Sequence, residues 1–183
     1  NPEIPEGTEY YLPAGSSYRI TPFELAKGFR LVGSSEGVKP KVILDDWWRI
    51  AEGSYITALE FENIEFSHTS NNKYFMNADK SFTIESVSFV NCDFIGLTRG
   101  FWRHQQATSK HIMSFAVEGC RFDKCGWQTG SYGLMDLRSF NDPTAYDQVD
   151  KAVFRNCTFS RDNDGTTGFG CRFQNHIRYS SHL

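Results

Sequence analysis

The stretch Val87-Ser88-Phe89-Val90-Asn91-Cys92-Asp93-Phe94 decides the fold, because three other stretches of the chain repeat its pattern. They are residues 59–66 (LEFENIEF), 115–122 (FAVEGCRF) and 152–159 (AVFRNCTF). The first residues of consecutive copies lie 28, 28 and 37 positions apart (87−59, 115−87 and 152−115). A motif that recurs at such a period indicates a stacked, solenoidal architecture, in which one copy cannot bury its apolar face without its neighbours.

Each copy has the pattern of two short strands joined by a sharp bend. Apolar residues alternate within each half of a copy, which is the two-residue period of a β-strand. Between the halves the alternation is one residue too long, and the extra position holds Asn63, Asn91, Gly119 and Asn156. Asn and Gly tolerate the left-handed backbone conformation that such a bend requires. Stacked bends would place Asn above Asn, where the side-chain amides can hydrogen-bond along the axis.

Stacking in register would collect like residues in three inward columns, with rungs separated by about 4.8 Å. The columns are Phe61, Phe89, Val117, Phe154, then Ile64, Cys92, Cys120, Cys157, then Phe66, Phe94, Phe122, Phe159. Apolar stretches upstream of the copies, at 47–50, 74–76, 100–103 and 133–137, are expected to form a third sheet. The sequence therefore predicts an all-β chain that winds as a single-stranded parallel β-helix of about five coils, with a further coil suggested at 168–173.

The 183 residues are expected to form one β-helix domain over 1–183. Residues 1–20 are polar with a Pro-rich start and are assigned to a linker or lead-in. A short N-terminal capping helix is expected over 21–28, because Thr21-Pro22-Phe23-Glu24 fits a capping box and Gly28 can end a helix. The coils are assigned to 29–160, and 161–183 to a C-terminal cap or a truncated coil.

Composition excludes two classes of partner. The net charge is −3 and no basic stripe is present, which argues against an electrostatic grip on nucleic acid. No apolar run approaches the roughly 18 residues of a membrane span, so no membrane insertion is expected. The cysteines of the central column are expected to be buried thiols. Whether Cys125 and Cys171 pair stays open.

The ladders resemble the right-handed parallel β-helix of the pectate-lyase-like superfamily. The residues that carry the resemblance are Asn77-Ala78-Asp79, the bend 91–94, Arg99-Gly100-Phe101-Trp102-Arg103 and Gly119-Cys120-Arg121-Phe122. The run from Phe75 to Phe122 is also similar to pectin-lyase-like domains of unknown function in surface proteins of gut bacteria. The resemblance covers about residues 28–160 and implies a right-handed coil, a glycan-related role and an extracellular or cell-surface location. Fold alone does not establish a function.

A basic and aromatic cluster gives the main candidate site. Arg99, Trp102, Arg103, His104, Lys110 and His111 lie within thirteen residues, and Asp136 and Arg138 come at a similar phase of the next coil. Arg forks suit the carboxylate of an acidic sugar and an indole face suits its ring. We therefore expect Arg99, Trp102 and Arg138 to bind substrate, and Arg103, His104 or Lys110 to act as the base of a lyase. The alternative is ordinary solvated charge, with Trp102 partly buried under a loop.

Two other segments are weaker candidates. Trp127 and Tyr132 lie in a Gly-flanked loop that either presents a sugar platform or closes over the core. Residues 161–165 (RDNDG) resemble half of a calcium loop, but the further ligands and the distal Glu do not follow in register. No metal ligands and no cofactor are therefore assigned, with Ca²⁺ as a weak alternative.

Three functions from different classes fit these observations. The first is an extracellular module that binds an acidic polysaccharide, as part of a longer surface protein. The second is a polysaccharide lyase that acts by β-elimination on uronic-acid polymers. The third is a non-catalytic structural spacer. The sequence identifies neither the glycan nor the oligomeric state.

Overall fold

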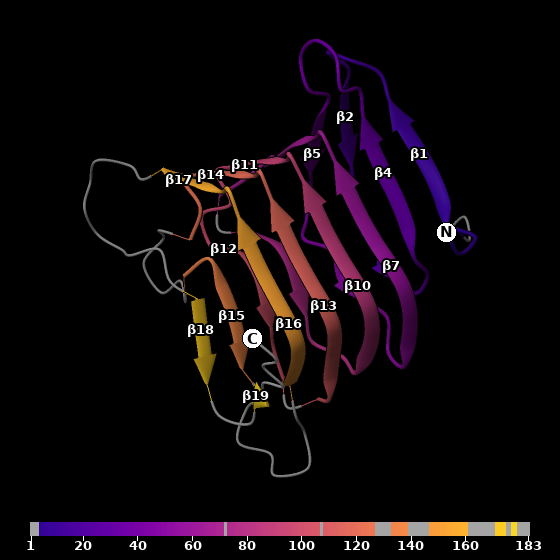
Figure 1. The fold of residues 1–183 in the computed structure, drawn as a ribbon, viewed down its shortest axis with the longest axis vertical. Helices are drawn as coiled ribbons and strands as arrows, with labels where there is room; N and C mark the ends of the chain where they lie inside the picture. Colours follow the sequence, from indigo (N-terminus) through magenta and orange to yellow (C-terminus); the bar gives the residue numbers. More distant parts are fainter. Residues whose placement is uncertain are drawn as a thin grey trace.

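The computed structural model describes residues 4–71, 73–106, 108–126, 133–138, 147–160, 171–174 and 177–178. Within these ranges the chain forms nineteen β-strands and no helix, and hence no helix long and apolar enough to cross a membrane. Figure 1 shows the strands stacked side by side in layers, with β1 at one end of the stack and β16 to β18 toward the other.

Three sheets run along the stack, and all their pairings are parallel. Sheet A has seven strands: β1 (Thr8–Leu12), β4 (Phe29–Gly33), β7 (Ser54–Glu62), β10 (Phe82–Val90), β13 (Lys110–Glu118), β16 (Asp147–Arg155) and β19 (Ile177–Arg178). Sheet B has six: β2 (Ser17–Ile20), β5 (Lys41–Leu44), β8 (Glu65–His68), β11 (Asp93–Ile95), β14 (Arg121–Asp123) and β17 (Thr158–Ser160). Sheet C has four: β9 (Tyr74–Ala78), β12 (Gly100–His104), β15 (Met135–Arg138) and β18 (Cys171–Gln174). The pair β3 (Glu24–Leu25) and β6 (Arg49–Ile50) precedes sheet C and is joined to it by a parallel bridge between Trp48 and Met76.

In every sheet the strand number rises by three from one neighbour to the next, so each turn of the chain contributes one strand to each layer. Strands β1 to β18 make six turns of three, and β19 begins another. The expected count of about five coils is therefore too low. The reason lies at the start of the chain, where the stretch expected to be a lead-in forms β1 and β2 and pairs with β4 and β5.

The capping helix expected over 21–28 is wrong. This segment holds β3, in which Glu24 and Leu25 pair in parallel with Arg49 and Ile50. Leu25 is buried, and the ring of Phe23 packs edge-on against Trp48 at 5.4 Å between centroids. A capping box is a local signal, and here the tertiary pairing of a buried strand overrides it.

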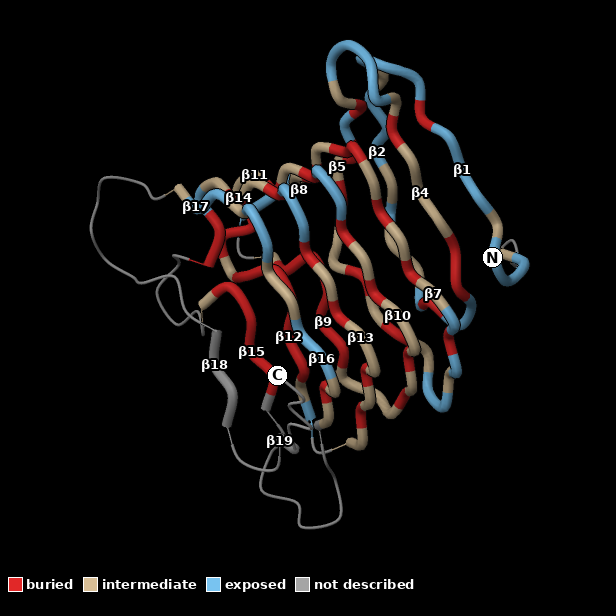
Figure 2. Tube along the Cα trace, viewed as in Figure 1, coloured by how far each residue is buried: buried red, intermediate tan, exposed pale blue. Residues whose placement is uncertain are grey.

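The column of Phe66, Phe94, Phe122 and Phe159 is confirmed. Neighbouring ring centroids lie 5.5, 4.9 and 5.3 Å apart, with the planes within 14° of parallel. Phe61 and Phe89 stack in the same way at 4.8 Å. Figure 2 shows the buried segments recurring at equivalent places from strand to strand, so that the core runs along the stack. Like residues therefore lie over like residues, as the repeat predicts.

The bends between sheets A and B are also confirmed. Asn63, Asn91 and Asn156 have φ angles of 55°, 50° and 54°, and Gly119 has 63°. The side-chain amide of Asn91 donates to Oδ1 of Asn63 at 2.7 Å, which is one step of the expected ladder. Gly119 has no side-chain amide and therefore interrupts the ladder at the next turn.

Replacing Asn91 by Ala is expected to lower the free energy of unfolding by about 1–2 kcal/mol. The reason is that Ala has a Cβ, which is unfavourable at a positive φ angle, but lacks the polar side chain through which Asn tolerates that conformation. The control is Asn91→Gly, which loses the bond to Asn63 but keeps the conformation, as Gly119 does one turn later. Urea unfolding of both variants checks this. Equal losses for the two variants would mean that the amide ladder, and not the backbone conformation, sets the cost.

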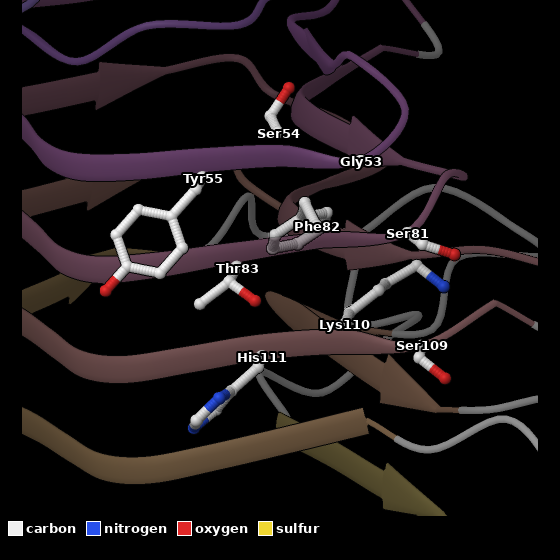
Figure 3. Close-up of a pocket in the computed structure, with 9 residues that line it drawn as sticks. All are labelled: Gly53, Ser54, Tyr55, Ser81, Phe82, Thr83, Ser109, Lys110 and His111. Atoms are coloured by element: carbon white, nitrogen blue, oxygen red, sulfur yellow. The ribbon is translucent and has the colours of Figure 1, made fainter.

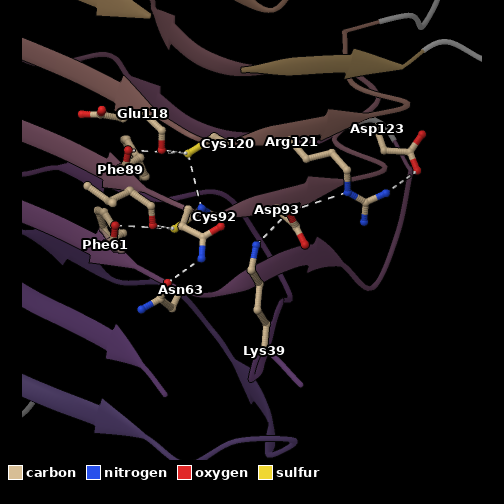
Figure 4. Close-up of polar contacts among 12 residues, drawn as sticks. Lys39, Phe61, Asn63, Phe89, Cys92, Asp93, Glu118, Cys120, Arg121 and Asp123 are labelled. Carbon is tan, nitrogen blue, oxygen red and sulfur yellow. Dashed lines mark hydrogen bonds and ion pairs between the residues drawn. The ribbon is translucent and has the colours of Figure 1, made fainter. Parts of the chain in front are cut away.

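The central column holds free thiols. Cys92 and Cys120 are buried, and the Sγ atoms of Cys92, Cys120 and Cys157 each donate to a carbonyl of the preceding turn at 3.5 Å. Figure 4 shows the first two of these contacts one above the other. Cys125 is a free buried thiol as well, and burial raises its pKa to about 12. The side chain of Cys171, its possible partner, lies outside the described residues.

Candidate functional site

An irregularity in sheet C decides which side chains face outward. Gly100 pairs with Tyr74 and Trp102 with Met76, but the N–H groups of both Phe101 and Trp102 donate to the one carbonyl of Leu134, at 2.7 and 3.3 Å. Two consecutive residues, Phe101 and Trp102, belong to the core, whereas strict alternation would send one of them outward. Because β12 stays paired with β9 one residue to one, this is a break in the alternation of side chains without an inserted residue, and after it the outward position falls on Arg103.

Two arginines meet on one tyrosine at the outer side of sheet C. The guanidinium carbons of Arg99 and Arg103 lie 5.7 and 5.4 Å from the ring centroid of Tyr74. Nε of Arg99 also donates to the Tyr74 hydroxyl at 3.3 Å. Tyr74 is only 2% exposed, so these contacts form in a site with little water, where a cation–π contact is stronger than at an open surface.

Arg103 also faces a carboxylate from the next turn. It is in register with Asp136 on β15, and its Nε lies 3.7 Å from Oδ2 of that residue. Both side chains are buried, at 9% and 1% exposure. On the other side Arg103 is in register with Asn77 of β9, so three polar residues follow one another along the axis.

The cluster continues one turn toward the amino end. The ring of Trp47 lies 6.3 Å from that of Tyr74, and Nζ of Lys73 lies 4.5 Å from the Trp47 centroid. Arg49 approaches the same indole at 5.1 Å. Asp46 holds both cations, with Lys73 Nζ 2.9 Å from Oδ1 and Arg49 3.4 Å from Oδ2. We call the set Trp47, Arg49, Lys73, Tyr74, Arg99 and Arg103, with Asp46 and Asp136, the sheet C cluster.

The carboxylate at the exposed end of the sheet C cluster is ionised. Burial acts to raise the pKa of Asp46, but the hydrogen bonds from Lys73 and from the backbone N–H of Trp47, with the charges of Lys73 and Arg49, outweigh it and hold that pKa below its usual value. Asp46 therefore positions Lys73 and Arg49 as an anion between two cations. The side chains of Arg49 and Lys73 are 32% and 25% exposed, so this end of the cluster meets solvent, while Tyr74, Arg103 and Asp136 lie beneath it.

Three residues expected in the site lie elsewhere. Trp102 is fully buried and packs edge-on against Phe115 at 5.1 Å, so it offers no face to a sugar. His104 is fully buried against the ring of Phe82. Lys110 is fully buried too, and its Nζ donates to the carbonyls of Gln106 and Thr108 and to the Thr108 hydroxyl, at 2.7–3.1 Å. The Trp102 indole is therefore not available as the expected platform, and His104 and Lys110, two of the three expected bases, are buried in other contacts.

Some of the other expected site residues lie outside the part of the chain that the structure describes. Arg99 and Arg103 come together as described, and the backbone of Arg138 lies in β15, but its side chain is outside the described residues. Trp127, Tyr132 and the segment 161–165 also lie outside them. Sequence reasoning missed Trp47, Lys73 and Tyr74. Their signal was an aromatic residue at the start of the stretches at 47–50 and 74–76, with a basic residue directly before Tyr74.

No metal site is found among the residues that the structure describes, since none of them form a group of three or more His, Cys, Asp or Glu side chains. Comparison with protein-family models, with curated proteins and with solved structures gave no match to this chain. The chemistry of the sheet C cluster therefore has to be argued from its own geometry. Guanidinium and ammonium groups beside two aromatic rings suit an anionic ligand that also has an apolar face.

Proposed function

We propose that this chain is a glycan-binding module, a right-handed parallel β-helix of the pectate-lyase-like type that binds an acidic polysaccharide outside the cell or at its surface. The handedness follows the general rule, since about 98% of parallel crossovers within one sheet are right-handed. The observation that carries the function is the convergence of Arg49, Lys73 and Arg99 on Trp47 and Tyr74 from three consecutive turns. An acidic polysaccharide is a linear anion, and cations repeated along the axis match it.

The buried part of the cluster supports this role without contacting the ligand. Asp136 fixes Arg103 from one side and the Tyr74 ring fixes it from the other. Arg99 shares that ring, so its guanidinium is held in place before a ligand arrives. A cationic side chain that is already ordered loses less conformational entropy when a ligand binds. A larger part of its interaction free energy therefore contributes to binding affinity.

The lyase alternative has less support than binding. A lyase needs a base within reach of the proton next to the carboxylate. His104 and Lys110 were expected to supply it, but both are buried in other contacts. Arg103 is 9% exposed and lies against Asp136. Binding requires only the exposed end of the sheet C cluster, where Arg49 and Lys73 meet solvent.

The double substitution Arg49→Ala with Lys73→Ala is expected to weaken binding of the acidic polymer by about 10- to 100-fold, since a charge-assisted hydrogen bond contributes about 1.5–3 kcal/mol. Binding is measured by calorimetry with polygalacturonate, alginate, hyaluronan and chondroitin sulfate. Added NaCl should weaken it further, because salt screens partly exposed charges. The control is Arg155→Ala on sheet A, whose side chain is 64% exposed and faces Glu118 at 3.9 Å.

Three results would contradict the proposal. Failure of the folded protein to bind any of the four polymers would favour the spacer. Equal loss in the Arg155→Ala control would mean general charge attraction and no site. Ultraviolet-absorbing unsaturated products from any of the polymers would favour the lyase.

A further inference from the structure

The surface has a hollow on sheet A, formed by residues outside the sheet C cluster. It has a volume of about 260 Å³ and is lined by the first two residues of β7, β10 and β13 and by the residue before each strand, at 53–55, 81–83 and 109–111 (Figure 3). The three triplets are in register, with Tyr55 beside Thr83 and Thr83 beside His111. We call this hollow the sheet A groove. Its volume is slightly below the roughly 300–1,000 Å³ of typical small-molecule sites, which suits a single sugar unit better than a larger ligand.

The lining of the sheet A groove combines one exposed aromatic ring with several hydroxyls. Tyr55 is 56% exposed, although its hydroxyl donates to Glu85. Figure 3 shows Tyr55, Thr83 and His111 on one side of Phe82, and Ser81 and Ser109 on the other. Phe82 is 4% exposed and forms an apolar floor. A pyranose ring has an apolar C–H face and a rim of hydroxyls, and this lining can meet both.

The charges around the sheet A groove disfavour an acidic ligand. Glu52 accepts a hydrogen bond from the Ser81 N–H at 3.2 Å, and Glu85 accepts one from Tyr55. Asp150 lies 3.0 Å from Nε2 of His111. The Nζ of Lys110 is turned toward the oxygens of Gln106 and Thr108, at 2.7–3.1 Å. Three carboxylates therefore contact residues that line the groove, and they would repel a uronate or a sulfated sugar.

We propose that the sheet A groove binds a neutral hexose or pentose unit of a polysaccharide, with the sugar ring on Tyr55 and its hydroxyls on Thr83, His111 and the flanking serines. Three strands span two rung spacings, about 10 Å. A short run of linked sugars along the axis therefore meets one turn after another. This site lies on a different sheet from the sheet C cluster, has the opposite charge around it and takes a different class of ligand. The proposal therefore does not depend on whether the sheet C cluster binds an acidic polysaccharide.

The experiment is calorimetric titration of the folded chain with hexasaccharides of the cello-, xylo-, manno- and malto- series at millimolar concentration. At least one series should bind. Tyr55→Ala should weaken that binding about tenfold, and Thr83→Arg, which fills the groove from an outward strand position, should abolish it. The matched control is Tyr11→Ala on β1, a tyrosine that is 62% exposed in the first turn. It should leave binding unchanged.

The outcome separates this site from the sheet C cluster. The Arg49→Ala, Lys73→Ala variant should keep neutral-sugar binding, and Tyr55→Ala should keep acidic-polymer binding. Absence of binding to all four hexasaccharides overturns the proposal. So does binding that survives both Tyr55→Ala and Thr83→Arg, or binding that Tyr11→Ala reduces as much as Tyr55→Ala. Circular dichroism of each variant confirms that the sheets are intact before titration.

Discussion

Phe94→Ala is expected to lower the free energy of unfolding by about 3–5 kcal/mol, the usual cost of removing a fully buried aromatic side chain. Phe94 lies in the middle of its column, stacked on Phe66 at 5.5 Å and on Phe122 at 4.9 Å. Phe75, Phe89 and Phe101 contact it from the other two sheets, at 4.6–5.5 Å. The cavity left by Ala would thus be surrounded by aromatic rings held by their own stacking, and the site could not collapse to fill it.

Guanidinium unfolding followed by circular dichroism measures the loss. The matched control is Phe159→Ala, at the end of the same column, where the side chain is 43% exposed. It should cost less than about 2 kcal/mol, since much of its surface already meets water. If Phe94→Ala does not fold, Phe94→Leu should still show a loss of about 1–2 kcal/mol. Equal losses at Phe94 and Phe159 would mean that the column does not act as a packed core.

The repeat predicted the fold because it encodes contacts between turns. A residue such as Phe94 recurs at 28-residue spacing only if each copy packs on the next, so the column could be read without coordinates. The same holds for the bends, where Asn63 and Asn91 mark a positive φ angle. The first turn escaped detection because β1 and β2 carry no Asn bend and end the stack, where most residues of each strand are exposed and leave no alternating apolar pattern. Local capping signals then suggested a helix in place of β3.

The site was only partly predictable, and the reason is the break in side-chain alternation at Phe101 and Trp102. Sequence placed a basic and aromatic cluster on the coil where the structure brings Arg99 and Arg103 together. Alternation alone would send Trp102 to the surface, but both Phe101 and Trp102 lie in the core. The aromatic partner of the arginines is therefore Tyr74, one turn earlier, and only the register between β9 and β12 reveals it.

Asp136→Ala is expected to cost about 3–5 kcal/mol, the typical effect of removing one partner of a buried ion pair. Asp136 is 1% exposed, and its removal takes a carboxylate that lies 3.7 Å from Nε of Arg103, whose side chain is 9% exposed. The control is Glu9→Ala, which removes a carboxylate 2.7 Å from Arg30 where the two side chains are 55% and 40% exposed. That change should cost no more than about 1 kcal/mol, despite the shorter distance, because water replaces the lost partner.

A double variant, Arg103→Met with Asp136→Leu, distinguishes a stabilising pair from one kept for another purpose. Well-packed apolar replacements of a buried pair are often neutral or stabilising, so most of the stability lost in Asp136→Ala should return. Urea unfolding of the singles and the double gives the coupling energy between the two positions. If stability returns while the affinity for the acidic polymer stays low, the pair is retained to hold Arg99 and Tyr74 in place and not to stabilise the fold. If the double variant binds the polymer as tightly as the natural chain, Arg103 and Asp136 have no part in binding. The binding site would then consist only of the exposed residues around Trp47.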